Sequence, residues 1–118
     1  MVGRNSTPEL TSAAFQVLVA LASGQAHGYA VMRFVEQVTN GVVRLPPGTL
    51  YRTMARLVAD GLVEEVETMD PEAPHDARRR YYRLTPLGQR VAREEGAVLS
   101  RIVAAAEAAG LLAGESVS

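Results

Sequence analysis

The stretch LPPGTLYRTMARLVADGL, residues 45–62, decides the fold because it has a marked start, a marked stop and two different faces. Pro46 and Pro47 interrupt whatever precedes them, and proline is favoured in a first helical turn, where its missing N–H is not needed. Thr49 can cap locally, and Gly61 supplies a left-handed stop. Between these signals one stripe is apolar at helical spacing: Leu50, Met54, Leu57 and Val58.

A second stripe on the other side of this helix carries two hydroxyl groups and two arginines: Thr49, Arg52, Thr53 and Arg56. It offers hydrogen-bond donors and positive charge without a carboxylate, which suits a groove of DNA. A solvated surface face with two ordinary arginines would have the same composition. The helix alone leaves both interpretations open.

Length and composition indicate one small globular domain. The chain has 118 residues, of which 47% are hydrophobic and 21% charged, and it contains no cysteine. Disulfides and thiolate metal sites are therefore excluded. The longest apolar run, Val17 to Ala22, is too short to span a membrane, and the first ten residues contain no apolar signal region. We therefore expect a cytoplasmic protein with no membrane association.

The charged residues are segregated along the chain. The net charge of −1 and the pI of about 6.1 argue, taken alone, against a nucleic-acid partner. However, the acids come first (Glu64, Glu65, Glu67, Asp70, Glu72, Asp76) and an arginine-rich window follows (Arg78, Arg79, Arg80, Arg83, Arg90, Arg93). A locally positive surface can therefore form on a nearly neutral protein.

Two helices are predicted before the central one. The first begins at Thr7 or Thr11, and from Ala13 to Ala22 its only polar residue is Gln16, so it is buried on more than one side. Ser23 to His27 is predicted to form a turn. The segment GYAVMRFVEQVTNG, from Gly28, then has helical spacing of its apolar residues Tyr29, Met32, Val35 and Val38. This helix, a short connection and the central helix, which has a basic outer face, form a helix-turn-helix pattern.

After Gly61 the helical spacing of apolar residues ends, and the sequence predicts a β-hairpin. LVEEVET and RRRYYRL are predicted strands, and Met69 to Ala77 is a predicted exposed loop with two prolines. On the second strand Arg80, Tyr82 and Leu84 share one face, with Tyr82 and Leu84 expected in the core. Arg79, Tyr81 and Arg83 share the other face. The glutamates of the first strand lie across from these arginines, so cross-strand ion pairs compete with DNA for them.

The last helix is predicted from Pro86 to Ala109, after a Thr85 cap. Its apolar residues follow a coiled-coil-like 4-3-4-3 spacing, at Val98, Ile102, Ala105, Ala109 and Leu112. We expect this seam to form a dimer interface with the two-sided first helix, through Phe15, Val19, Val98, Ile102, Ala105 and Ala109.

Three runs in this order resemble the PadR family of bacterial transcription regulators: HGYAVMRFVEQ, PGTLYRTMARLVADGLV and RRRYYRLTPLG. The resemblance covers about residues 10–95. It implies a mainly α fold with a small β-hairpin, that is, a winged helix-turn-helix in residues 1–84 and a C-terminal dimerisation helix and tail in residues 85–118.

The resemblance also implies a function. We expect a ligand-responsive repressor that binds a palindromic operator as a homodimer, with double-stranded DNA contacted by Thr49, Tyr51, Arg52, Thr53, Arg56, Arg79 and Arg83. A small-molecule effector would act between the first and last helices. The alternative is a winged-helix protein–protein interaction module without DNA binding. No cofactor, metal site or enzymatic activity is expected, since the chain has no phosphate-binding glycine loop and only two histidines.

Two single residues have competing interpretations. His27 either senses a ligand or acts as a helix cap or packed ring, and the second role is the more common one for such a residue. Tyr51 either donates its hydroxyl to a DNA phosphate or packs beside the helix-turn-helix junction. The sequence does not separate these two roles for Tyr51.

Overall fold

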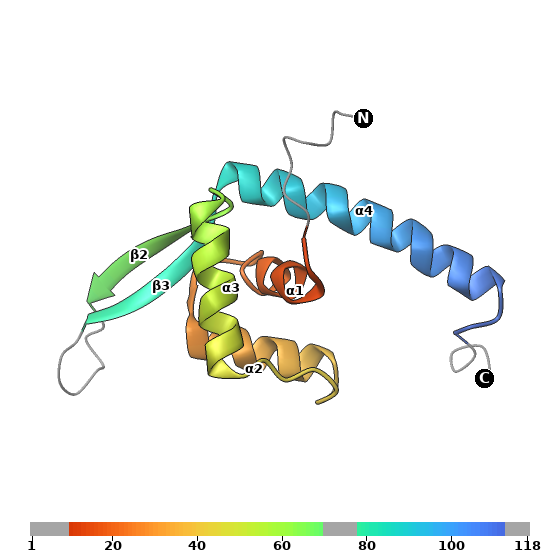
Figure 1. Cartoon of the computed structure of the whole chain (residues 1–118), viewed down its shortest axis with the longest axis horizontal. Helices are drawn as coiled ribbons and strands as arrows, with labels where there is room; N and C mark the ends of the chain where they lie inside the picture. Colours follow the sequence, from red (N-terminus) through yellow and green to blue (C-terminus); the bar gives the residue numbers. More distant parts are fainter. Residues whose placement is uncertain (1–9, 70–77, 113–118) are drawn as a thin grey trace.

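The computed structural model describes residues 10–69 and 78–112, with residues 67–69, 78 and 79 described by their backbone alone. The elements in chain order are α1 (Ser12–Ala20), β1 (Ala26–His27), α2 (Gly28–Val38), α3 (Pro47–Ala59), β2 (Val63–Met69), β3 (Arg78–Leu84) and α4 (Pro86–Ala108) (Figure 1). This is the predicted fold, mainly helical with a winged helix-turn-helix. The possible start at Thr7 and the interior of the predicted loop lie outside the described residues.

Helix α1 begins at the second of its two predicted caps. The hydroxyl oxygen of Thr11 accepts a hydrogen bond from the amide of Ala14 at 3.0 Å. Val17 and Leu18 are fully buried, whereas Val19 is 36% exposed. The helix therefore fills the core with one side and leaves part of its apolar surface accessible.

Helix α2 forms as predicted, but its apolar stripe is wrong at two positions. Tyr29 and Val38 are 58% and 64% exposed, whereas the predicted Val35 is buried and Met32 packs against the core. Gly28 and Val31 are buried in addition. Both stripes have helical spacing, so periodicity alone could not choose between them. The Nδ1 atom of His27 accepts a hydrogen bond from the amide of Ala30 at 3.3 Å, which confirms a capping role.

Helix α3 packs through three of its four predicted apolar residues. Leu50, Met54 and Leu57 are buried, while Val58 is 37% exposed. The N-cap is Pro46, which provides no side-chain hydrogen bond, so the predicted capping by Thr49 is wrong. Gly61 has φ of 78°, the left-handed conformation expected at this stop.

A small antiparallel sheet has the strand order β1-β3-β2. The register from Val63 opposite Leu84 to Met69 opposite Arg78 confirms the hairpin. Tyr82 is buried and Leu84 packs against the core, as predicted. Strand β1, which pairs Ala26 with Tyr82, was missed because two residues show no periodicity, and the prediction of a turn there is corrected.

Helix α4 is anchored at its first two turns. The Thr85 hydroxyl accepts from the Gly88 amide at 3.0 Å and donates to the Gly61 carbonyl at 2.7 Å. The Thr85 amide donates to the carbonyl of Leu62 at 3.1 Å. Gly88 and Val91 are the buried residues of this helix, and its later turns extend away from the rest of the molecule (Figure 1).

Candidate DNA-binding surface

The exposed face of α3 is centred on Arg52, Ala55 and Ala59, opposite the buried residues of the same helix. Thr49 and Thr53, which we predicted to lie on this face, are only half exposed because they lie closer to the core. Ala55 and Ala59 follow Arg52 at helical spacing and were missed, because small apolar residues carry no charge signal. Their short side chains allow the helix backbone to approach a neighbouring surface closely.

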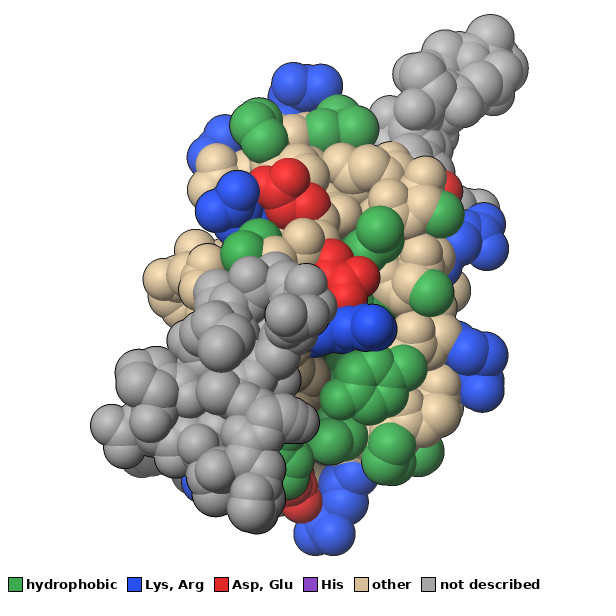
Figure 2. Space-filling view, turned by 90° about the vertical axis from the view of Figure 1, so that its left-hand side faces the viewer, with side chains coloured by type: hydrophobic (Ala, Val, Ile, Leu, Met, Phe, Trp, Pro, Cys, Tyr) green, Lys and Arg blue, Asp and Glu red, His purple; other side chains and the backbone are tan. Residues whose placement is uncertain are grey.

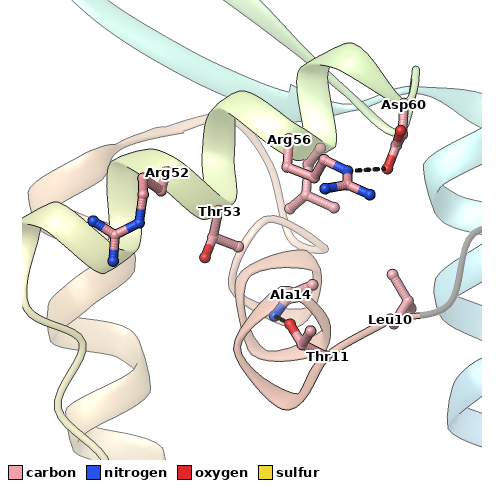
Figure 3. Close-up of a pocket in the computed structure, with 8 residues that line it drawn as sticks. Leu10, Thr11, Ala14, Arg52, Thr53, Arg56 and Asp60 are labelled. Atoms are coloured by element: carbon pink, nitrogen blue, oxygen red, sulfur yellow. Dashed lines mark hydrogen bonds and ion pairs between the residues drawn. The ribbon is translucent and has the colours of Figure 1, made fainter.

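The predicted polar stripe instead borders a hollow between α3 and the start of α1, of about 230 Å³. In Figure 3 Thr53 points from α3 toward α1, and Arg56 lies beside Asp60. The hollow is lined by Leu10, Thr11, Ala14, Arg52, Thr53, Arg56, Leu57 and Asp60.

The two arginines of α3 have different partners. The Nε atom of Arg56 lies 3.4 Å from Oδ2 of Asp60, one turn later on the helix. Asp60 therefore extends the polar stripe of α3 with a carboxylate. The prediction described this stripe as free of acids and overlooked Asp60. Arg52 contacts only a hydroxyl within the described residues, because its Nη2 atom lies 3.5 Å from Oγ1 of Thr49. Arg52 is thus the arginine of this helix with the least neutralised charge.

Among the residues whose side chains are described, the wing carries one arginine on each face, Arg80 and Arg83. Nε of Arg83 lies 2.6 Å from Oε2 of Glu64. Nε of Arg80 lies 3.1 Å from Oε2 of Glu65. The predicted cross-strand ion pairs are therefore present at both positions. Because side chains alternate along a strand, Arg80 shares the face of buried Tyr82, whereas Arg83 lies on the opposite face. The predicted site residue Arg79 has its side chain outside the described part.

A second hollow, of about 350 Å³, lies where α2, α3 and β3 meet. It is lined by His27, Gly28, Tyr29, Tyr51, Arg80 and Tyr82, and we call it the junction hollow. Tyr51 is 48% exposed, and a β-carbon on Gly28 would lie 2.5 Å from its hydroxyl oxygen. Tyr51 therefore packs its hydroxyl end at the junction, while about half of the residue remains exposed.

Tyr82 remains a neutral hydroxyl group in this hollow. Burial raises the pKa of Tyr82, and the nearby Glu65 and Tyr51 raise this pKa further, while Arg80 opposes them.

Figure 2 looks from the side of the wing and shows basic, acidic and hydrophobic side chains interspersed on this face. The surface is therefore mixed rather than uniformly positive.

The predicted dimer residues lie at accessible positions. Val98 and Ile102 of α4 are 44% and 59% exposed, Ala105 and Ala109 are exposed, and Phe15 of α1 is half-buried. Between the two helices lies a groove of about 290 Å³, which we call the α1–α4 groove. It is lined by Phe15, Leu18, Val19, Ala22, Leu84, Gln89, Ala92 and Arg93.

The described residues contain neither a metal-binding cluster nor a membrane-spanning helix. No group of three or more His, Asp or Glu side chains there could hold a metal ion. Among the helices in the same part of the chain, none has both the length and the apolar character needed to cross a membrane.

Comparisons with known proteins give concordant results. Residues 17–94 match the transcriptional regulator PadR-like family. The chain is 34% identical over 87 residues to the transcriptional regulator Rv3488 of Mycobacterium tuberculosis, covering 73% of this chain and 74% of that protein. It is 40% identical over 86 residues to an uncharacterized 37.1 kDa protein in transposon TN4556 of Streptomyces fradiae. That match covers 73% of this chain but spans only 22% of that relative's length.

A solved structure has the same fold. Bacillus subtilis PadR in complex with operator DNA superposes with a TM-score of 0.60 at 16% identity. The alignment covers 69% of this chain and 44% of the Bacillus protein. At this identity the likeness establishes the fold and nothing more specific.

Proposed function

This chain belongs to the PadR-like family of transcriptional regulators, and from that premise we propose that it binds operator DNA as a homodimer, with α3 in the major groove and the wing on the backbone. In a helix-turn-helix protein the second helix of the motif contacts base edges, and flanking elements contact phosphates. The DNA in the complex of the Bacillus relative supports the same partner for this chain.

The observation that carries the proposal is the exposed face of α3. Arg52 extends from a surface made smooth by Ala55 and Ala59, so the helix can enter a groove without bulky side chains in the way. Arginine contacts guanine bidentately, and alanine can contact the methyl group of thymine. We assign base readout to Arg52 and backbone contacts to Tyr51, Arg56, Arg79 and Arg83, with Thr49 and Thr53 bordering the same surface.

A mobility-shift assay tests the function directly. The probe is a duplex from upstream of the gene that encodes this protein, and the control is a scrambled duplex of equal length and composition. Preferential binding of the upstream duplex supports the proposal. Equal, weak binding of both duplexes at low salt, lost at about 0.15 M salt, contradicts it, because that behaviour is purely electrostatic.

We further propose that the dimer forms through α1 and α4. The second half of α4 has no buried residue, and an isolated helical segment of this length is marginally stable in water. Its apolar residues would remain an exposed patch without a partner. A second copy of the chain would cover both this seam and the accessible side of α1. Such a dimer would present two α3 helices to the two halves of a palindromic operator.

The proposal extends to regulation in the cytoplasm. We assign a repressor role and place a small-molecule effector in the α1–α4 groove, where an occupant would alter the spacing of the two α3 helices. Its lining is largely apolar and includes Gln89 and Arg93, which suits an apolar ligand with a polar group. If operator affinity stays constant across candidate effectors and across dimeric groove variants, this mechanism is wrong.

A protein-binding role without DNA is the second candidate. It is favoured by the ion pairs of Arg56, Arg80 and Arg83, which reduce the free positive charge of the proposed surface. This candidate predicts that neither duplex in the mobility-shift assay binds, even at low salt.

A further inference from the structure

We infer that the junction hollow is a phosphate-binding site, with Tyr82, Tyr51 and the first amides of α2 as donors, and that its occupant is a phosphodiester of the DNA backbone beside the base pairs that α3 contacts. The inference rests on the proposed DNA-binding function. It adds Gly28, Tyr82 and Arg80 to the residues expected at the DNA.

The first observation is the hydroxyl group of Tyr82. The residue is only 8% exposed, yet it lines the hollow. Among the described residues, no hydrogen bond involves its hydroxyl, and no buried side-chain oxygen is sealed away without a partner. Within this part of the chain the hydroxyl is therefore an unpaired donor on a residue that borders the hollow. A buried ring that presents a free hydroxyl to a cavity indicates a ligand with an acceptor oxygen.

The second observation is the start of α2, which has 11 residues. The first amides of a helix have no carbonyl partner one turn earlier, and anions bind there readily. His27 accepts from the Ala30 amide, which leaves the Tyr29 amide as a donor at this end of the helix. Tyr29 lines the same hollow as Tyr82.

Gly28 keeps this site open. A β-carbon at this position would lie 2.5 Å from the Tyr51 hydroxyl oxygen and 2.9 Å from the ring carbon that bears it. The absence of a side chain thus lets Tyr51 bring its hydroxyl to the amide end of α2. Glycine is used in the same way wherever a backbone must approach a phosphate closely.

Arg80 contributes positive charge at the edge, and Glu65 opposes it. The pair is held at 3.1 Å through Nε of Arg80, whose side chain is 68% exposed. This exposure leaves the guanidinium accessible to a phosphate. The Glu65 carboxylate would repel a second negative charge, so the site suits the single charge of a phosphodiester better than a doubly charged phosphate monoester.

The test compares two tyrosines of one strand. Tyr82→Phe removes the hydroxyl that enters the hollow, whereas the control Tyr81→Phe removes one on the opposite face of the sheet, where the Tyr81 ring lies 5.6 Å from that of His27. Tyr82→Phe should weaken binding to the upstream and scrambled duplexes by the same factor, about tenfold, because a hydrogen bond to a charged group is lost. Tyr81→Phe should stay within about twofold of the wild type.

A second readout locates the phosphate. Duplexes with a single methylphosphonate, which lacks the charge of one backbone phosphate, are scanned along each half-site. At one position the methylphosphonate should lower the DNA affinity of wild-type protein. The same methylphosphonate should lower the affinity of the Tyr82→Phe variant much less. Gly28→Ala, which displaces the Tyr51 hydroxyl, should reduce the penalty at the same position. No position-specific difference between wild type and Tyr82→Phe would overturn the inference.

Failure of the inference and failure of the proposed function remain distinguishable. Suppose that wild-type protein binds the upstream duplex and that Tyr82→Phe and Tyr81→Phe have equal affinities. The inference is then wrong, while the proposed function is still supported. If wild-type protein binds no duplex, the proposed function is wrong, and dimethyl phosphate, which carries the single charge of a phosphodiester, is titrated into the protein to test the site. Phosphate-induced shifts of the Gly28 and Tyr29 amide NMR signals, absent in Tyr82→Phe, would assign the hollow to a free phosphate-bearing ligand. No shift would overturn the site itself.

Discussion

The guanidinium of Arg56 and the carboxylate of Asp60 form an ion pair one turn apart on α3, with Nε and Oδ2 separated by 3.4 Å. This pair occupies the C-terminal part of the helix proposed to enter DNA. An acid at this position is unfavourable near phosphates, and it also restrains the arginine beside it. Removing the charge of Asp60 should therefore change DNA affinity in a predictable direction.

Asp60→Asn should strengthen binding to every duplex. The change removes a negative charge close to the DNA and releases Arg56, so we expect about a two- to fivefold gain for upstream and scrambled duplexes alike. Glu107→Gln changes the net charge equally but lies near the far end of α4. Fluorescence anisotropy on both duplexes measures the effect. An equal gain from both substitutions would show that net charge alone is responsible.

Arg52→Ala and Arg56→Ala should distinguish a base-reading arginine from one that contacts the DNA backbone. Arg52 lies nearer the N-terminus of α3 and is the candidate for a bidentate contact to guanine, worth roughly 1–3 kcal/mol of discrimination. Arg52→Ala should therefore lower affinity for the operator more than for the scrambled duplex. Arg56→Ala should weaken both alike and reduce the salt slope by about one unit.

Arg83→Ala should behave as Arg56→Ala does, since Arg83 is assigned to the backbone. Binding isotherms at several salt concentrations decide these assignments. If Arg52→Ala weakens both duplexes equally, base readout is not at the start of α3.

Gly88→Ala and Gly96→Ala should have opposite effects on stability, although both replace a glycine of α4. A β-carbon at Gly88 would collide with the carbonyl oxygen of Leu62, whereas at Gly96 the nearest atom is a ring carbon of Phe15 at 3.8 Å. We expect Gly88→Ala to lower the free energy of unfolding by about 1–3 kcal/mol. Gly96→Ala should raise it by up to about 1 kcal/mol through helix propensity. Urea denaturation of both variants measures the difference, and equal values would contradict the packing at Leu62.

Ile102→Glu should dissociate the dimer. The substitution places a charge in the proposed apolar seam of α4, where it would be buried against the partner. Ser100→Glu is the matched control, because Ser100 is exposed and lies on the opposite side of the helix. Sedimentation velocity at micromolar concentration should give monomers or aggregates for Ile102→Glu and dimers for Ser100→Glu. A wild-type monomer in the same experiment would exclude the interface.

The sequence predicted the elements well where local signals mark their ends. Proline, threonine and glycine gave the bounds of α3 and α4 to within two residues, and alternation gave the two faces of the second wing strand. The groups that build the junction hollow could not be predicted in this way. Tyr51 and Gly28 are far apart in the sequence, and nothing local to either residue indicates the contact between them.

The exposed face of α3 was predicted only approximately for a related reason. The polar residues chosen as its centre were those with functional groups, but exposure depends on which side of the helix the core covers. Thr53 lies toward α1, and Ala55 lies in the solvent. Composition identified the helix, and packing decided its orientation.

The anchoring of α4 gives this helix the properties of a lever. Thr85 joins its first turn to Gly61 and Leu62, directly after α3, whereas the turns beyond Val91 contain no buried residue. The 23-residue helix is about 35 Å long at 1.5 Å per residue. A displacement of ~3 Å at its far end would correspond to a rotation of only about 5° at the Thr85 joint, by the same helical length. Movements at the dimer seam would therefore reach α3 reduced in amplitude, as a small rotation of the helix proposed to contact the bases.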